Sequence, residues 1–249
     1  MEQPAACLFD LDGLLLDTEP LHAEAWQRAA SQFGRPLSAA ELMSLRGRRR
    51  HDCADQVLGW IHAAGIETPS RDQLLAVRQP IAEALLVQAQ PMPGAPELVA
   101  HCHARGLPMA LATSSSRSAV ELKASPHPWL QLITVRVHGD DPQLRQGKPA
   151  PDVFLLAAER LGANPAECWA FEDSPAGVQS ARAAGCTVHV LPPGHLDPME
   201  RQEAYPGVDR FLSSLEDVLQ QLLDQCQAEI VAIDHELSTC VVRSTLYGF

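Results

Sequence analysis

An apolar run near the start of the chain ends abruptly in two carboxylates, and this feature constrains the possible folds most strongly. Phe9 is followed by Asp10, Leu11, Asp12 and Gly13. A buried strand that ends in two acids and then turns sharply fits an open α/β sheet, in which ligands bind outside the strand ends. One acid can attack phosphorus while the other moves protons, provided that a divalent cation suppresses their repulsion. Taken alone, an Asp-x-Asp in a surface turn explains the pattern equally well.

Three further polar clusters each follow an apolar run. Thr113–Ser116 open a predicted helix, whose N-terminus offers hydroxyls and backbone N–H groups to an anion. Lys148 lies in a Pro-rich turn, where its ammonium can neutralise a nucleophile and a bound phosphate. Glu172 and Asp173 end another run and offer the oxygen ligands that suit Mg²⁺. Each cluster alone has an ordinary structural explanation, but the four together, in this order, indicate one shared site.

The hydrophobic pattern predicts an all-helical segment directly after the first strand. Beyond Asp17, apolar residues recur every fourth position up to Phe33. Ser38 and Ser70 each begin a predicted capping box, and Pro80 is expected to kink or split the helix in which it lies. Further helices are predicted over 51–64 and 71–88. We therefore expect residues 17–90 to form an inserted helical cap.

From residue 93 onward, apolar runs alternate with helical patterns, which predicts a doubly wound, Rossmann-like parallel sheet. Besides the first strand, the predicted strands are 107–112, 132–137, 168–171 and 187–191. The predicted helices are 95–105, 116–124, 151–162, 175–184 and 213–224. The expected fold is thus an α/β core built from residues 1–16 and 91–225 and interrupted by the cap. No role is assigned to the extension 226–249.

The four clusters together resemble the haloacid dehalogenase superfamily of phosphohydrolases, over essentially residues 5–215. The inserted helices are similar to the smaller, helical type of cap in that family. Dehalogenases of the superfamily lack an acid at the position of Asp12, and its ATPases carry threonine there, so the acid favours phosphatase or phosphomutase chemistry. The chain is most similar to the pseudouridine-5′-phosphatase-like and β-phosphoglucomutase-like branch in the motifs Asp10-Leu-Asp-Gly-Leu-Leu-Leu-Asp-Thr-Glu, Met92-Pro-Gly, Leu111-Ala-Thr-Ser-Ser, Gly139-Asp-Asp-Pro and Gly147-Lys-Pro.

The resemblance implies a role for each motif residue. Asp10 is the expected nucleophile, which forms an aspartyl phosphate. Asp12 is expected to protonate the leaving group and then to activate water. Thr113 and the Ser114 amide are expected to hold phosphoryl oxygens, and Lys148 to offset negative charge.

The resemblance also implies the cofactor Mg²⁺. Its expected ligands are Asp10, the main-chain carbonyl of Asp12, and Asp173, with Glu172 helping directly or through water. Phosphoryl transfer needs mainly positioning and electrostatic stabilisation, and this set of residues supplies both.

Candidate substrate-binding residues lie in the predicted cap. Four arginines cluster within residues 46–50 of an otherwise acidic chain, and we expect one of them, Arg50, to grip the substrate. Glu19 and His22 lie on the first cap helix beside the catalytic loop and are further candidates. A solvated basic turn and an ordinary interhelical histidine are equally plausible explanations.

Composition limits the partners. Nineteen Lys and Arg against thirty-one Asp and Glu give a net charge of −12, so no basic excess exists to bind nucleic acid. The chain has no apolar stretch long enough to span a membrane. Its seven cysteines are scattered, which is typical of free thiols in a reducing cytoplasm. We expect a cytoplasmic enzyme acting on a small phosphorylated metabolite. The oligomeric state stays open, with a monomer favoured.

Three functions are compatible with these residues. The favoured one is a Mg²⁺-dependent phosphatase that hydrolyses a nucleotide or sugar phosphate through an aspartyl phosphate. A β-phosphoglucomutase-like sugar phosphomutase is the alternative, because His22 and Arg50 match positions in that enzyme. The predicted cap offers no clear lysine for a mutase, although Arg78 is a possible substitute. A non-catalytic binding protein is the third, and it would have no chemical need for both Asp10 and Asp12.

Overall fold

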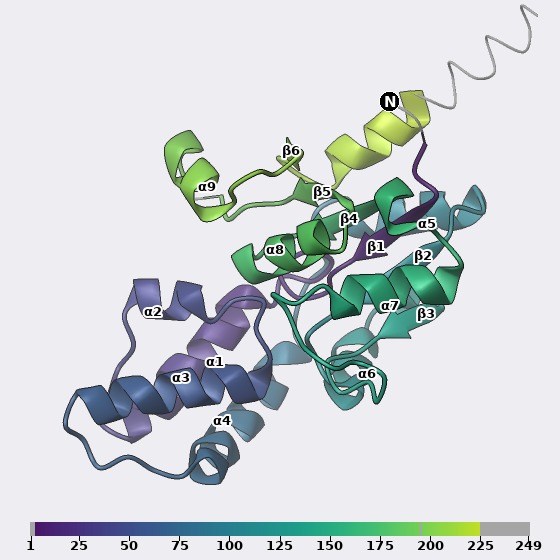
Figure 1. The fold of residues 1–249 in the computed structure, drawn as a ribbon. Coiled ribbons are helices and arrows are strands. Elements are labelled where there is room, and N and C mark those ends of the chain that lie inside the picture. Colours follow the sequence, from purple (N-terminus) through teal and green to yellow (C-terminus); the bar gives the residue numbers. More distant parts are fainter. Residues whose placement is uncertain (1–2, 195, 225–249) are drawn as a thin grey trace, which may run out of the picture.

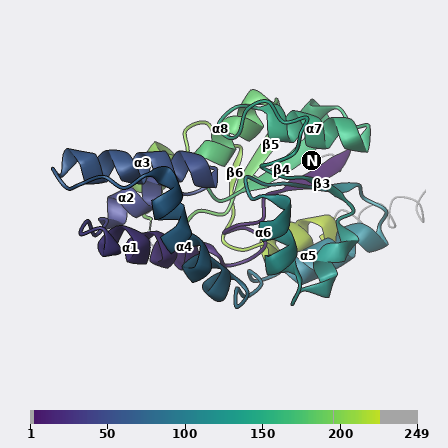
Figure 2. The same cartoon turned by 90° about the horizontal axis from the view of Figure 1, so that it is seen from below.

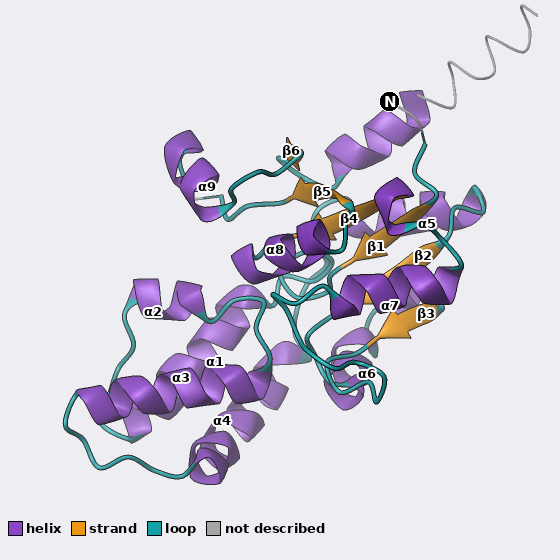
Figure 3. Ribbon diagram, in the orientation of Figure 1, coloured by secondary structure: helices purple, strands orange, loops and turns teal. Residues whose placement is uncertain are grey.

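The computed structural model describes residues 3–194 and 196–224. Within these residues, six strands form one parallel sheet in the order β3-β2-β1-β4-β5-β6 (Figure 1, Figure 3). The strands are β1 (Ala6–Phe9), β2 (Met109–Ala112), β3 (Val135–Val137), β4 (Cys168–Glu172), β5 (Thr187–Val190) and β6 (Arg210–Phe211). The chain passes from β1 to β2 and β3, and then crosses to the other side of β1 at β4. Strand order therefore reverses at β1, where open α/β sheets bind their ligands.

The strand register aligns the ends of the three central strands. Phe9 of β1 pairs with Leu111 of β2 on one side and with Phe171 of β4 on the other. Because all three strands run in the same direction, the residues that follow them emerge at one edge of the sheet. The polar clusters after these strands are thus brought to a common edge.

Helices cover both faces of the sheet, as expected when successive strand residues point to opposite sides (Figure 2). On one face, Phe9 belongs to a hydrophobic cluster with α5 (Ala95–Ala104). On the other face, Leu8 belongs to a cluster with α7 (Asp152–Leu161) and α8 (Pro175–Ala183). Burial on both faces explains why these strands read as continuous apolar runs. The predicted doubly wound α/β sheet is confirmed.

Four helices between β1 and α5 lie together beside the sheet (Figure 1). We call them the helical insert: α1 (Glu19–Gln32), α2 (Ala39–Ser44), α3 (Arg50–Ala63) and α4 (Arg71–Leu86). Their own hydrophobic cluster includes Trp26, Val57 and Leu74. The two connections to the sheet run side by side, since the Asp17 amide donates to the Gln90 carbonyl at 2.8 Å.

The insert helices at Ser38 and Ser70 begin where the sequence predicts, but the helix that contains Pro80 differs from the prediction. Both predicted capping boxes, at Ser38 and Ser70, are present. The sequence predicts a kink or a split at Pro80, and the split is wrong, because α4 runs through this residue as one helix. Pro80 lies on the exposed side, whereas Leu74 and Ala82 are buried on the opposite side. Packing of that buried side outweighs the loss of one backbone hydrogen bond at the proline.

Two other predictions need correction, and two elements were not predicted. The strand predicted over 132–137 is shorter, because a 3₁₀ helix that begins at Pro128 occupies residues up to Leu132. The sequence did not indicate α9 (Pro198–Ala204) or β6, which carry no hydrophobic periodicity; α9 does open with a capping box at Asp197 that could have revealed it. The helix predicted over 213–224 occupies 216–224. The extension 226–249 lies outside the described residues.

Two further observations concern composition. None of the helices in residues 3–194 and 196–224 has both the length and the apolar character needed to cross a bilayer. The five cysteines in this part of the chain are free, as predicted, and all five are buried; they are Cys7, Cys53, Cys102, Cys168 and Cys186. Cys226 and Cys240 lie outside the described residues.

Candidate active site

The carboxyl ends of β1, β2 and β4 supply most of the candidate residues. Asp10 follows β1, Thr113 follows β2, and Glu172 ends β4 with Asp173 next in the chain. Lys148 enters from the loop between β3 and α7. All five side chains are buried. Four segments that are distant in sequence thus meet at the switch point of the sheet.

Lys148 bridges two of the acids. Its ammonium donates to Asp10 Oδ1 and to Glu172 Oε1, each at 2.5 Å. Burial raises the pKa of Asp10 to about 7; Lys148 opposes this rise, and the charge of Glu172 adds to it. Burial alone would lower the pKa of Lys148, but the two carboxylates outweigh burial and raise it. The lysine is therefore a fixed positive charge beside Asp10.

The residues present fit a divalent cation. One oxygen from each of Asp10, Glu172 and Asp173 lies within 4.8 Å of the others. Asp173 Oδ1 is buried and has no hydrogen-bond partner among the described residues. Burial raises the pKa of Asp173 well above its usual range, although the charge of Arg46 opposes this. The three carboxylates offer more negative charge than the contacting Lys148 and Arg46 can neutralise. Hard oxygen donors of this kind suit Mg²⁺.

The turn after β1, which carries Asp10 and Asp12, requires a glycine. Gly13 has a φ of +85°, and a Cβ atom there would lie 2.3 Å from Asp173 Oδ2. Only glycine meets both demands without strain. The loop after β1, which carries Asp10 and Asp12, can therefore approach the loop of Asp173 closely enough to form one cluster.

Asp12 has different partners from Asp10. Lys123 Nζ contacts both Asp12 carboxylate oxygens at 2.5 Å. Thr18 Oγ1 donates to Oδ1 at 2.7 Å, and Ser115 Oγ donates to Oδ2 at 2.7 Å. Burial opposes ionisation of Asp12, but the charge of Lys123 and the hydrogen bond from His22 outweigh it and hold the pKa of Asp12 well below its usual range. The two acids of the motif therefore face separate cations.

Sequence reasoning missed the contacts of Lys123 and Thr18. Lys123 lies on α6 (Arg117–Ala124), where a lysine in the last turn is an ordinary helix feature. Thr18 precedes α1 and reads as a simple helix cap, although no such side-chain hydrogen bond is present. Ser115 belonged to the hydroxyl cluster after β2, but only its neighbours Thr113 and Ser114 were selected.

Thr113 and Ser114 lie in the loop after β2. Thr113 is buried, and its Oγ1 accepts a hydrogen bond from the Ser115 amide at 3.1 Å. Ser114 Oγ donates to the Gly47 carbonyl at 2.9 Å, which ties this loop to the helical insert. The two residues are therefore held at the edge where Asp10 lies, next to the insert.

The helical insert brings Glu19 and Arg46 to the acidic cluster. Arg46 Nη2 contacts Asp173 Oδ2 at 2.5 Å, and Arg46 Nε lies 3.0 Å from Glu19 Oε2. Arg50, by contrast, is exposed and donates to the Gln79 side chain at 3.0 Å. Of the arginine cluster, Arg46 rather than Arg50 contacts an acid of the candidate site.

His22 connects Asp12 to a buried arginine. Its Nε2 lies 3.2 Å from Asp12 Oδ1, and its Nδ1 lies 2.8 Å from Arg78 Nη2. Arginine can only donate, so Nδ1 accepts and Nε2 carries the hydrogen that is donated to Asp12. Burial lowers the pKa of His22, which favours this neutral form.

Comparisons with known proteins agree with this arrangement. The family model for haloacid dehalogenase-like hydrolases matches residues 4–185. A Drosophila melanogaster protein named probable pseudouridine-5′-phosphatase is 38% identical over 219 residues, which cover 85% of this chain and 90% of that protein. The (DL)-glycerol-3-phosphatase 1 of Arabidopsis thaliana, a mitochondrial protein, is 33% identical over 216 residues, with 84% and 70% covered.

Solved structures share the fold. The crystal structure of a β-phosphoglucomutase from Clostridium difficile superposes with a TM-score of 0.75 at 19% identity, covering 92% of this chain and all of that one. At this identity the likeness establishes the arrangement of the elements. The family match spans most of the chain and includes Asp10, Asp12, Lys148 and Asp173. The chain belongs to the haloacid dehalogenase-like hydrolases.

Proposed function

We propose that the protein is a Mg²⁺-dependent phosphatase that hydrolyses a small phosphorylated metabolite through an aspartyl phosphate on Asp10. The observation that carries this proposal is the separation of the two acids of the motif. Asp10 lies with Lys148 and the acids that fit a cation, whereas Asp12 lies with Lys123. Two carboxylates in different environments can take different roles in one reaction. The relatives described above are named as phosphatases.

The proposed reaction has two steps. A carboxylate oxygen of Asp10 forms a bond to phosphorus while the bond to the leaving oxygen breaks, and protonated Asp12 gives its proton to that oxygen. Water then attacks phosphorus, its proton passes to Asp12, and phosphate leaves Asp10. The contacts of Asp12 favour its carboxylate form, which is the form that accepts the proton of water.

Other residues hold the phosphoryl group. We propose that Thr113, the Ser114 amide and Lys148 bind its oxygens, so that charge developing on them is stabilised. Mg²⁺ held by Asp10, Asp173, Glu172 and the Asp12 carbonyl would supply further charge neutralisation.

We further propose that the helical insert acts as a cap over the site, with the predicted bounds 17–90. Its contacts with the core support this: Arg46 contacts Asp173, and the Gly47 carbonyl contacts Ser114. A cap that contacts both loops can exclude water and select the leaving group. Glu19 and His22 remain candidates for contacts with the substrate, and Arg50, which is exposed and bonded to Gln79, is the weaker candidate.

A phosphatase screen tests the proposal. The purified protein is assayed with Mg²⁺ against pseudouridine 5′-phosphate, glycerol 3-phosphate, nucleotides and hexose phosphates, ranked by kcat/KM. Phosphate release that EDTA stops, and that Asp10→Asn abolishes, supports it. If no phosphoester is hydrolysed, the binding function is favoured instead.

The mutase alternative needs a separate assay. With β-glucose 1-phosphate and a glucose bisphosphate primer, a mutase forms glucose 6-phosphate without net phosphate release. The helical insert contains no lysine; its buried cation Arg78 reaches His22 instead. Phosphate release without isomerisation would reject the mutase.

A further inference from the structure

Lysine is used in only two places in this chain. Of its nineteen basic residues, seventeen are arginines and two are lysines, Lys123 and Lys148. Both are buried, with 0% and 3% of their surface exposed. Each contacts one of the two acids that follow β1: Lys148 contacts Asp10, and Lys123 contacts Asp12. A chain that otherwise uses arginine thus has a compact ammonium at both acids.

Lys123 holds the Asp12 carboxylate together with two hydroxyls. Its ammonium contacts both carboxylate oxygens and lies 2.8 Å from Ser115 Oγ. Ser115 Oγ in turn donates to Oδ2, and Thr18 Oγ1 donates to Oδ1. These partners come from α6, from the loop after β2 and from the segment before α1. His22 of α1 donates to Oδ1 as well, and donors from four separate segments leave the carboxylate little freedom to rotate.

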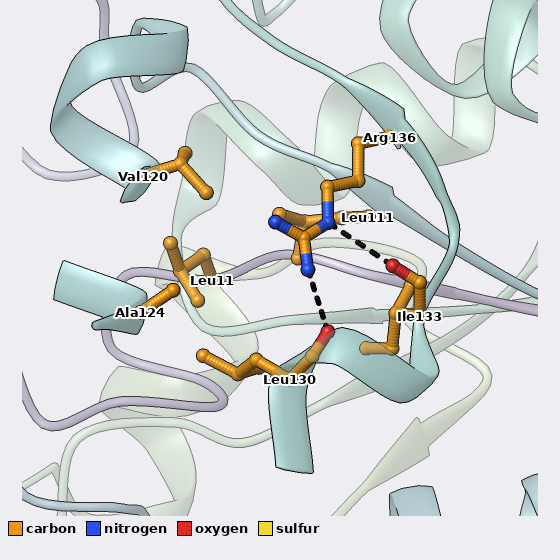
Figure 4. A pocket seen from close by; sticks show the side chains of 7 residues that line it. All are labelled: Leu11, Leu111, Val120, Ala124, Leu130, Ile133 and Arg136. Atoms are coloured by element: carbon orange, nitrogen blue, oxygen red, sulfur yellow. Dashed lines mark hydrogen bonds between the residues drawn. The ribbon is translucent and has the colours of Figure 1, made fainter. Parts of the chain in front are cut away.

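Helix α6 is itself packed against the catalytic loop. Val120 and Ala124 of α6 pack in one hydrophobic cluster with Leu11, the residue between the two acids, and the three side chains line a small apolar pocket within it (Figure 4). Arg136 also lines this pocket and donates to the carbonyls of Leu130 and Ile133. Leu11 and Val120 are each 1% exposed. The distance from Lys123 to the catalytic loop is therefore fixed by packing as well as by charge.

A buried ion pair is a poor way to stabilise a fold, because dehydrating both ions offsets most of their attraction. An arginine could not take the same position, since its planar fork is larger and differently directed than an ammonium. We propose that Lys123 is a positioning residue that fixes the orientation of the Asp12 carboxyl group, so that its protonated form transfers the proton to the leaving oxygen. This inference rests on the proposed phosphatase reaction, in which Asp12 protonates the leaving group.

The test measures how kcat/KM depends on the leaving group. p-Nitrophenolate departs as a stable anion and needs no proton, whereas an alkyl alcohol such as glycerol does. For Lys123→Met, we expect kcat/KM for the preferred alkyl phosphate to fall roughly 100-fold, the scale of general acid catalysis. For p-nitrophenyl phosphate we expect a fall of less than about fivefold. A substitution that only loosened the fold would lower kcat/KM for both substrates by the same factor.

Three further variants sharpen the test. Arg117→Met removes an exposed cation from the same helix and should leave both substrates unaffected. Ser115→Ala removes a single oxygen, and it should lower kcat/KM for the alkyl phosphate selectively, by a smaller factor than Lys123→Met does. In an Asp12→Ala background, Lys123→Met should cause no additional selective loss, because it acts through Asp12.

The outcomes separate the two proposals. If the wild type hydrolyses no phosphoester, the proposed function itself fails. If the wild type is active, but Lys123→Met and Ser115→Ala lower kcat/KM equally for both substrates or for neither, the positioning role of Lys123 is wrong. If Lys123→Met does not fold, Ser115→Ala decides the question by the same ratio.

Discussion

The buried cations of the sheet core and those of the helical insert differ in their contacts. In the core, Lys148 and Lys123 each contact carboxylates of the catalytic loop. In the insert, Arg78 lies 4.7 Å from the centre of a Trp26 ring, and its Nε has no hydrogen-bond partner in the described residues. Arg49 likewise has two buried nitrogens without a partner there.

This difference separates two tasks. The core charges are paired before a substrate arrives, which is the arrangement that phosphoryl transfer requires. In the insert, Arg49 and Arg78 keep N–H donors that have no acceptor among the described residues, and we expect a substrate oxygen to bind one of them. We therefore expect changes in the core to act on the chemical steps and on metal binding, and changes in the insert to act on substrate recognition.

The largest effect is expected at the nucleophile. Asp10→Asn should lower kcat by at least about a thousandfold, because a carboxamide cannot form the proposed aspartyl phosphate. Asp17→Asn alters an exposed acid of the same loop and should keep near-normal activity. If Asp10→Asn turned over substrate at close to the wild-type rate, Asp10 would not be the nucleophile.

A second core variant tests the metal site. Asp173 carries a buried oxygen without a partner in the described part of the chain, so Asp173→Asn should weaken Mg²⁺ binding by roughly 10- to 100-fold. Isothermal titration calorimetry with Mg²⁺ and no substrate measures this directly. Unchanged affinity would show that the cation binds elsewhere; Asp17→Asn again serves as the control.

Besides Asp173, the core contains other buried polar groups without a hydrogen-bond partner in the described part of the chain, and His189 is one of them. His189 stacks on Phe171 with ring centres 5.1 Å apart, and neither ring nitrogen has a hydrogen-bond partner among the described residues. Burial lowers the pKa of His189 to about 4. The native state thus holds it neutral, while the unfolded chain takes up a proton below about pH 6.5.

Its stabilising contribution is therefore complete above about pH 6.5 and is lost as the pH falls toward 4. Between pH 7 and pH 5, the wild type should lose about 2 kcal/mol more unfolding free energy than His189→Leu. Urea unfolding at the two pH values measures this difference. Equal losses in both proteins would mean that His189 is already protonated or hydrated in the fold.

The smallest effect is expected in the insert, and it compares two neighbouring arginines. The Arg49 guanidinium lies against Gly147, where a Cβ atom would come within 2.1 Å of its Nε. Arg49→Met should raise KM about tenfold with little change in kcat, the value of one hydrogen bond to a charged group. Arg50→Met should change KM less than about twofold. The reverse result would favour the sequence-based choice of Arg50.

The core site was largely predictable from sequence. Parallel strands bring their carboxyl ends to one edge, so Asp10, Thr113 and Glu172 could be placed together from the apolar runs before them. Lys123 could not be, because its contact with Asp12 spans 111 residues and depends on how α6 packs. A lysine in an amphipathic helix carries no local sign of such a partner.

The insert was less predictable for a physical reason. The arginines of residues 46–50 follow one another in a short turn, and neighbouring positions there point in different directions. Local sequence therefore did not indicate that Arg46 meets Asp173 while Arg50 meets Gln79. The continuous α4 through Pro80 likewise depends on tertiary packing that a local rule does not contain.

The most direct measurement of the central claim is to trap the phosphorylated residue. Asp12→Ala is mixed with p-nitrophenyl phosphate and Mg²⁺, so that the first step proceeds while the second lacks its base. The reaction is quenched, reduced with borohydride, and digested for mass spectrometry. We predict that residue 10 is converted to homoserine, the product of reducing an aspartyl phosphate. A burst of p-nitrophenolate with residue 10 unmodified would contradict the account.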